Sequence, residues 1–175
     1  MRTAKTNLVI IVSLMVVFLV SSPAVATSIN CERETLKGLG GVQVLVEEIK
    51  QGEVVTAIDD QALKTDIETV LLEEKLEIHD SSKASWEGNI LVATVSVMRP
   101  SDKLKTLTDY YVYTVELALR QRVNLVRKRW IKTSAITWIG TLTGVTDLEG
   151  LNAAVRKSVL INLGKFIEDY RRVNN

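Results

Sequence analysis

The stretch 110–127 reads YYVYTVELALRQRVNLVR and decides the fold that the sequence predicts. Apolar side chains stand at every second position from Tyr111 onward, except at Gln121. They are Tyr111, Tyr113, Val115, Leu117, Leu119, Val123 and Leu125. The alternate positions are mostly polar, among them Thr114, Glu116, Arg120, Arg122 and Asn124. A repeat of two with one apolar and one polar face predicts a β-strand on a sheet that is buried on one side.

This strand is too long to lie straight within a compact domain. Its 18 residues would span about 60 Å at about 3.3 Å per residue. A globule of about 150 residues has a diameter of only about 40 Å. Because Gln121 also interrupts the alternation, we expect a bulge or a bend near residues 120–122, or a hairpin arm that extends past the body.

Other apolar patterns predict four more strands. The expected ranges are 42–49, 76–78, 89–98 and 131–142. Lys128 and Arg129 are expected in the turn before the last of these strands, in which Ile136 and Trp138 share one phase. Pro100 ends the strand before the long one, because proline cannot donate to a strand ladder.

Apolar side chains at helical spacing predict two helices. The first begins near Asp59 or Asp60, whose carboxylates suit a helix N-terminus, and ends near Lys75. The second covers 148–170 and starts at a capping box formed by Thr146 and Glu149. Together, the predicted strands and helices form an α+β domain in the order β-α-β-β-β-β-α. A curved, mostly antiparallel sheet with both helices on one face is the simplest arrangement that buries every apolar stripe.

Residues 1–26 have the features of a cleaved export signal. Arg2 and Lys5 precede an apolar run over 8–20, and the residues 24–26 that follow a break at Pro23 offer small side chains at the −3 and −1 positions. The run is shorter than the roughly 20 apolar residues that span a bilayer. We therefore expect export to the periplasm or the medium, a flexible leader over 27–41 and a single domain over 42–175, with no transmembrane span in the mature chain.

The chain carries 22 Lys and Arg against 21 Asp and Glu, so its overall charge directs it to no nucleic acid. Cys31 is the one cysteine, which excludes an intramolecular disulfide. A free thiol, a lipid-modified cysteine and an intermolecular disulfide remain open for Cys31. Asn30 stands where a lipoprotein signal has a small residue, which disfavours lipidation.

No set of residues on the chain forms a recognised catalytic or metal-binding pattern. His79 is the only histidine, so it lacks the partners that a zinc site or a nucleophilic triad requires. The three glycines over 38–41 lead into a strand and lack the Gly-Lys-Ser/Thr of a phosphate loop. We therefore expect no enzymatic activity, no metal and no cofactor.

Basic residues gather around the predicted hairpin and form the one candidate binding site. They are Arg120, Arg122, Arg127, Lys128, Arg129 and Lys132, with Trp130 beside them. A tryptophan among cations is typical of membrane interfaces and of contact hot spots. The alternative is that these charges only protect a sheet edge from aggregation.

Several segments resemble a group of small, uncharacterised secreted bacterial proteins. The resemblance lies in RETLKGLGGVQVLV at 33–46, TDIETVL at 65–71, the strand 115–125, AITW at 135–138 and KFIEDY at 165–170. The order of elements is also similar to the amino-terminal domain of the Tol-Pal translocation protein and to envelope accessory lipoproteins. Neither resemblance brings a catalytic or binding residue.

The sequence therefore predicts an exported, non-enzymatic domain of the cell envelope that binds a macromolecular partner. The partner is an unidentified protein or envelope component, and peripheral contact with anionic lipid is a further hypothesis. The alternative is a carrier of a lipid or small molecule, with a pocket between the sheet and the helices.

Overall fold

The computed structural model describes residues 31–50, 58–79, 88–99 and 109–174. The chain divides into two units, Met1–Cys31 and Glu32–Asn175. All helices and strands given below belong to the second unit. The expected export signal, 1–26, and the first residues of the expected leader lie outside the described residues.

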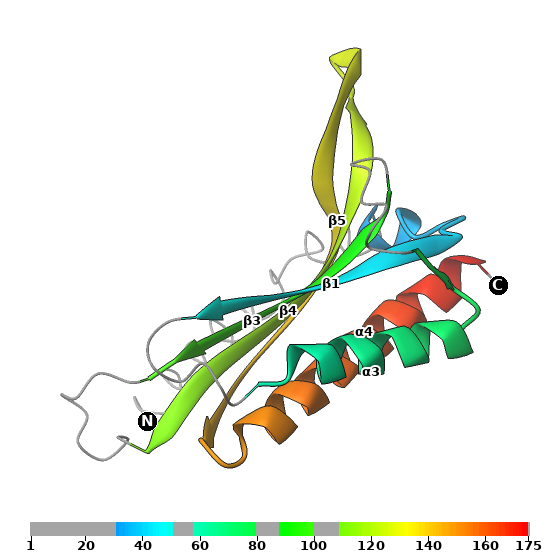
Figure 1. Cartoon of the computed structure of the whole chain (residues 1–175). Coiled ribbons are helices and arrows are strands. Elements are labelled where there is room, and N and C mark those ends of the chain that lie inside the picture. Colours follow the sequence, from blue (N-terminus) through cyan, green and yellow to red (C-terminus); the bar gives the residue numbers. More distant parts are fainter. Residues whose placement is uncertain (1–30, 51–57, 80–87, 100–108, 175) are drawn as a thin grey trace, which may run out of the picture. The chain divides into compact units, whose positions relative to one another are not determined.

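The second unit is an α+β domain built on one sheet. Its elements are β1 (Gly41–Lys50), α3 (Asp60–Glu73), β2 (Glu77–Ile78), β3 (Ile90–Met98), β4 (Tyr110–Leu125), β5 (Lys128–Asp147) and α4 (Leu151–Asn174). The strands lie in the order β2-β1-β3-β4-β5. The β1 strand pairs in parallel with β2 and β3, whereas β3–β4 and β4–β5 are antiparallel. Both helices cover one face of the sheet (Figure 1), and the predicted fold class and element order are confirmed.

The core lies between the sheet and the two helices. The apolar phase of β4, from Tyr111 to Leu119, is buried along its whole length. Helix α3 contributes the stripe Leu63, Ile67 and Leu71. Helix α4 contributes Leu151, Val155, Val159, Leu163, Phe166 and Ile167. These stripes follow the spacings that the sequence predicted, because each helix buries the one face that carries its apolar side chains.

The start of α3 agrees with the sequence, but the start of α4 does not. Asp59 caps α3, and its Oδ1 accepts a hydrogen bond of 2.9 Å from the backbone N–H of Ala62. Before α4, Asp147 Oδ1 accepts a bond of 2.7 Å from the N–H of Gly150. The helix therefore begins at Leu151, three residues later than expected, and Leu148 remains exposed.

Strand β5 differs most from its prediction. The turn lies at 126–127, and Leu125 pairs with Lys128, so Lys128 and Arg129 are already part of the strand. Ile136 and Trp138 do not share a face, because Ile136 is exposed and Trp138 is buried. The reason is an extra residue between them, Thr137, which shifts the phase of the strand at this point.

Part of the expected leader belongs to the packed domain. Residues 31–34 form a helical turn, and Leu36 and Leu39 are buried in the core. Gly38, at φ 72°, allows the chain to turn between them. The packed domain therefore includes residues that precede 42.

Two glycine substitutions test the packing of the sheet against α4. A Cβ on Gly144 would lie 2.5 Å from Cζ of the buried Tyr113. We expect Gly144→Ala to lower the free energy of unfolding by about 1–3 kcal/mol. Gly164 is exposed in α4 with no atom within 4 Å of the added Cβ, so Gly164→Ala should raise that free energy by about 0.5–1 kcal/mol. Urea unfolding measures both, and equal stability of the two variants would contradict the described packing.

Candidate binding surface on the β4–β5 arm

The β4–β5 hairpin continues beyond the strand that borders it. Strand β3 pairs with β4 only as far as Arg120, which lies opposite Ile90. Among the described residues, those of 121–135 that pair as strands do so only with one another, and Ile136 pairs with Arg120 at the base of the hairpin. Figure 1 shows this segment projecting past the ends of the other strands and away from both helices. We call residues 121–136 the arm, and it confirms the expectation of a hairpin that extends past the body.

A bulge and a small polar network mark the base of the arm. Leu119 pairs with Trp138 and Arg120 pairs with Ile136, so Thr137 is the extra residue. Its hydroxyl donates a hydrogen bond of 2.6 Å to Gln121 Oε1. The predicted irregularity near residues 120–122 is confirmed, and the polar Gln121 stands in an apolar phase because it bonds here.

Trp138 fixes the base of the arm to the core. Its ring is 3% exposed and meets Phe166 edge to face, with ring centroids 5.1 Å apart. The indole Nε1–H donates to Asp169 Oδ2 at 3.1 Å. Asp169 Oδ1 in turn accepts from Nε of Arg33, in the turn that precedes β1. Trp138 of β5 and Arg33 of the amino-terminal turn therefore both bond to Asp169 of the last helix.

The tip of the arm exposes apolar side chains that the fold does not use. Val126, in the turn, is 91% exposed, and Trp130 is 78% exposed. A second register shift places Leu125 opposite Lys128 and Asn124 opposite Lys132. The residues between these two pairs, 129–131, have no partner in β4. Trp130 is thus held outward by an irregular stretch of backbone, and Ile131 beside it is also exposed.

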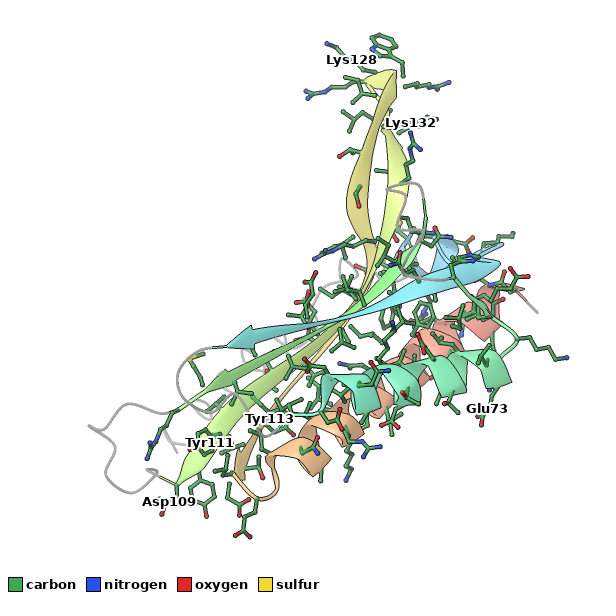
Figure 2. The ribbon with its side chains drawn as sticks, in the orientation of Figure 1. Glu73, Asp109, Tyr111, Tyr113, Lys128 and Lys132 are labelled. Atoms are coloured by element: carbon green, nitrogen blue, oxygen red, sulfur yellow. The ribbon has the colours of Figure 1, made fainter. Side chains whose placement is uncertain are left out.

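The structure brings four of the predicted site residues together at the tip. Arg127, Lys128, Arg129 and Trp130 are consecutive and exposed. Figure 2 shows Lys128 and, somewhat lower, Lys132 at the end of the hairpin that is remote from Tyr111 and Tyr113.

The other two predicted site residues lie lower on the hairpin. Arg122 is exposed on the arm itself. Arg120 lies at the base, where its Nη1 is 3.8 Å from Glu47 Oε1 of β1. Arg120 therefore belongs to the surface of the sheet, apart from the cationic tip.

All charged side chains of the arm are cationic. It carries five of the 22 Lys and Arg of the chain and none of the 21 Asp and Glu. Because charges farther away than about 8–10 Å are screened at physiological salt, the local balance governs what approaches the tip. The near-neutral charge of the whole chain therefore conceals a local excess of positive charge on the arm.

Sequence reasoning missed two apolar contributors, Val126 and Ile131. Val126 breaks the alternation at the point where the turn begins, and this break is the signal that could have identified it. Ile131 had been placed inside a regular strand. The irregular pairing of 129–131 that exposes it depends on a register that no local pattern reveals.

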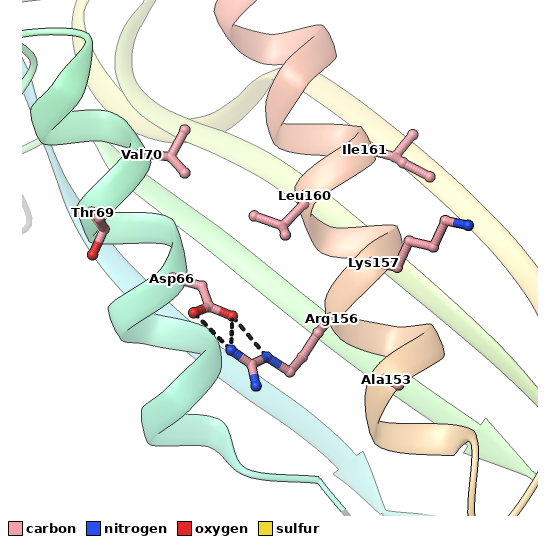
Figure 3. A pocket seen from close by; sticks show the side chains of 8 residues that line it. All are labelled: Asp66, Thr69, Val70, Ala153, Arg156, Lys157, Leu160 and Ile161. Carbon is pink, nitrogen blue, oxygen red and sulfur yellow. Dashed lines mark hydrogen bonds and ion pairs between the residues drawn. The ribbon is translucent and has the colours of Figure 1, made fainter.

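A shallow groove lies elsewhere, between α3 and α4. It has a volume of about 720 Å³ and is lined in part by Val70, Leu160 and Ile161 (Figure 3). Asp66 accepts hydrogen bonds of 2.8 and 2.9 Å from Arg156 across it. The groove is open to solvent between the two helices, whereas a carrier was expected to hold its ligand between the helices and the sheet.

No group of three or more His, Cys, Asp or Glu side chains within 31–50, 58–79, 88–99 and 109–174 is placed to hold a metal ion. In the same part of the chain, no helix has both the length and the apolar character that a membrane crossing requires.

The tip and the base of the arm should respond differently to mutation. Charge reversal at the exposed tip, Arg127→Glu with Lys128→Glu and Arg129→Glu, should leave the free energy of unfolding within about 0.5 kcal/mol of the wild type. Trp138→Ala removes a buried ring and should lower it by about 3–5 kcal/mol. Chemical denaturation followed by circular dichroism measures both. A tip variant as unstable as Trp138→Ala would show that the fold needs the tip.

Comparisons with known proteins give resemblance without a family. No protein-family model matches the chain, and no curated protein matches it. One similar structure is the hypothetical protein CT253 from Chlamydia trachomatis, with 10% identity, a TM-score of 0.34 and coverage of 76% of this chain and 92% of the other. Another is the rare lipoprotein B from Shewanella oneidensis, with 14% identity, a TM-score of 0.26 and coverage of 75% and 89%. The second is the kind of protein expected from the order of elements, but at these TM-scores neither assigns a role to this chain.

Proposed function

We propose that this chain is an exported, non-enzymatic domain of the bacterial cell envelope that binds an anionic macromolecular partner through the tip of its arm. The observation that carries the proposal is the exposure of Val126 and Trp130 at the end of a hairpin that the core does not need. The tip is the part of the arm that contacts the partner, and the domain below it is the support.

The composition of the tip favours a contact surface over simple edge protection. Charges alone suffice to keep a sheet edge from aggregating. An exposed tryptophan and an exposed valine do not serve that purpose, since apolar surface in water promotes association. Tryptophan and arginine are the side chains that contribute most energy where proteins bind their partners. Together they fit a partner that offers negative charge beside an apolar or ring-shaped surface.

The architecture of the arm suits a contact made at a distance from the domain. Trp138 ties the base of the arm to α4. The hydrogen bond between Gln121 and Thr137 links the two strands at the same level. The tip can then be covered by a partner without disturbing the buried phase of β4. Cations collected on one projecting element also direct an anionic partner to that element.

Export and the lack of catalysis are part of the proposal. Export is supported by the basic start, the apolar run and the small residues of 1–26. A non-enzymatic role is supported by the single histidine, His79, which is exposed beyond β2. A periplasmic or secreted location fits both.

Anionic vesicles test the proposed contact. The chain, expressed from its full-length sequence and processed by the cell, should sediment with vesicles that contain phosphatidylglycerol and not with phosphatidylcholine vesicles. Reversing Arg127, Lys128 and Arg129 to Glu should weaken this binding at least about 100-fold, because each basic residue near an anionic surface contributes about 1 kcal/mol.

A matched variant separates the tip from overall charge. Lys37→Glu with Lys157→Glu and Lys165→Glu reverses three exposed lysines outside the arm and changes the net charge by the same amount. This variant should bind nearly as the wild type does. Equal losses in the two triple variants, or no loss in the tip variant, would count against an anionic surface as the partner of the tip. Crosslinking in the native envelope with both variants extends the comparison to protein partners.

A further inference from the structure

The outer edge of β5 offers a second interaction surface, remote from the tip. Strand β5 is the last strand of the sheet, and no strand among the described residues pairs with its outer side. Thr35 Oγ1 donates to the carbonyl of Thr137 at 3.2 Å, so the amino-terminal turn occupies the edge at that level. The stretch from Ile139 to Asp147 lies beyond it.

The residues of this edge do not themselves supply the protection that exposed strands usually carry. Such edges are kept from pairing by short length, charged side chains, proline or cover. The opposite edge of the sheet follows that rule, because β2 has two residues and one of them is Glu77. Between Lys132 and Asp147, in contrast, β5 has 14 residues without a charge or a proline.

The sequence of the free stretch is nearly a palindrome. Residues 139–145 read IGTLTGV, which is symmetric about Leu142 apart from the exchange of Ile for Val. An antiparallel strand pair with a two-fold axis at Leu142 sets each residue opposite its mirror position. Like side chains would then meet across the pair.

We propose that two copies of this chain associate edge to edge through β5, with the two-fold axis at Leu142. On the face away from the helices, Thr141 meets Thr143 of the second copy, and Ile139 meets Val145. Ile139 is 40% exposed and Val145 62% exposed in one copy, and the pairing covers both. Threonine pairs and β-branched pairs are among the favourable cross-strand neighbours.

On the face that carries the helices, the two residues that flank Leu142 are glycines. Gly140 and Gly144 are required within each copy, because a Cβ there would meet the rings of Trp138 and Tyr113. In the dimer Gly140 lies opposite Gly144, so neither presents a side chain to the other copy. Leu142, between them, meets its own counterpart at the axis.

The charges of the paired strands and of the arms do not oppose the association. No charged side chain lies within the paired stretch 139–145. The cationic arms extend from opposite ends of an antiparallel pair and therefore point away from each other. The result is a continuous sheet of ten strands, five from each copy.

Engineered thiols test the register of this dimer. Cys31→Ser removes the one native cysteine, and the full-length chain is then purified as the cell processes it. Opposite residues in an antiparallel pair have Cα atoms about 4.5–5.5 Å apart, which is within the range of a disulfide. We expect Leu142→Cys to form a disulfide-linked dimer with itself under mild oxidation by copper phenanthroline.

A second pair of variants avoids any change to the half-buried Leu142. Thr141→Cys and Thr143→Cys should each stay unlinked alone, since equivalent residues are then about 8 Å apart. Mixing the two proteins should produce the crosslink, because position 141 of one copy faces position 143 of the other.

Sedimentation of the unmodified chain provides a readout without thiols. Thr141→Lys with Val145→Lys adds the charges that protect ordinary edges and should raise the dissociation constant of the dimer at least about tenfold. The proposal is overturned if Leu142→Cys and the mixed pair remain monomeric, or if Val126→Cys at the tip crosslinks as efficiently. A monomer at every concentration would also overturn it, and the edge would then be open to a strand from a different protein.

Discussion

The burial of one phase of β4 against α4 is the interaction on which the rest of the structure depends. Five alternate side chains, from Tyr111 to Leu119, are removed from water on the face that the helices cover. At about 25 cal/mol per Å² of apolar surface, burial of this kind is the main favourable term in folding. The apolar stripes of the helices pack on this face, and the arm begins where this burial ends.

The end of this burial separates the supporting domain from the arm. After Leu119 the strand meets a bulge in its partner, and Gln121 turns to the Thr137 hydroxyl. Trp138 closes the core at this level by packing on Phe166. Beyond that point the hairpin has no helix and no neighbouring strand among the described residues. The side chains of the tip are therefore not constrained by packing against the core.

The sequence predicted the parts of the fold that local periodicity determines. The order of elements, both helix stripes, the cap at Asp59 and the irregularity at Gln121 follow from spacing and length alone. The phase of β5 could not be predicted, since one extra residue at Thr137 inverts the face of every side chain before it. The start of α4 was wrong for a related reason: Asp147 bonds to Gly150 in the turn, and this contact competes with the predicted capping box.

The candidate site was predictable in composition and only partly in position. The run 127–130 was expected at the end of a hairpin and lies there. Arg120 was grouped with it by strand phase, but it lies at the base of the arm, beside Glu47 of β1. The alternation of the sequence predicts on which face of the strand a residue lies. It does not predict whether that residue lies at the tip or at the base of the arm, because the base is set by the point where β3 stops pairing with β4. That limit is set by tertiary contacts between segments far apart in the chain.

Native-state hydrogen exchange tests most directly whether a packed domain supports an arm that has only its own pairing. Amides of the buried β4 segment, 111–119, should exchange only through global unfolding, because their protection depends on the whole core. Amides of the arm, 121–136, should exchange much faster through local opening that leaves the domain folded. Protection in the arm equal to that in 111–119 would contradict the account, since it would mean that the arm opens only when the core does.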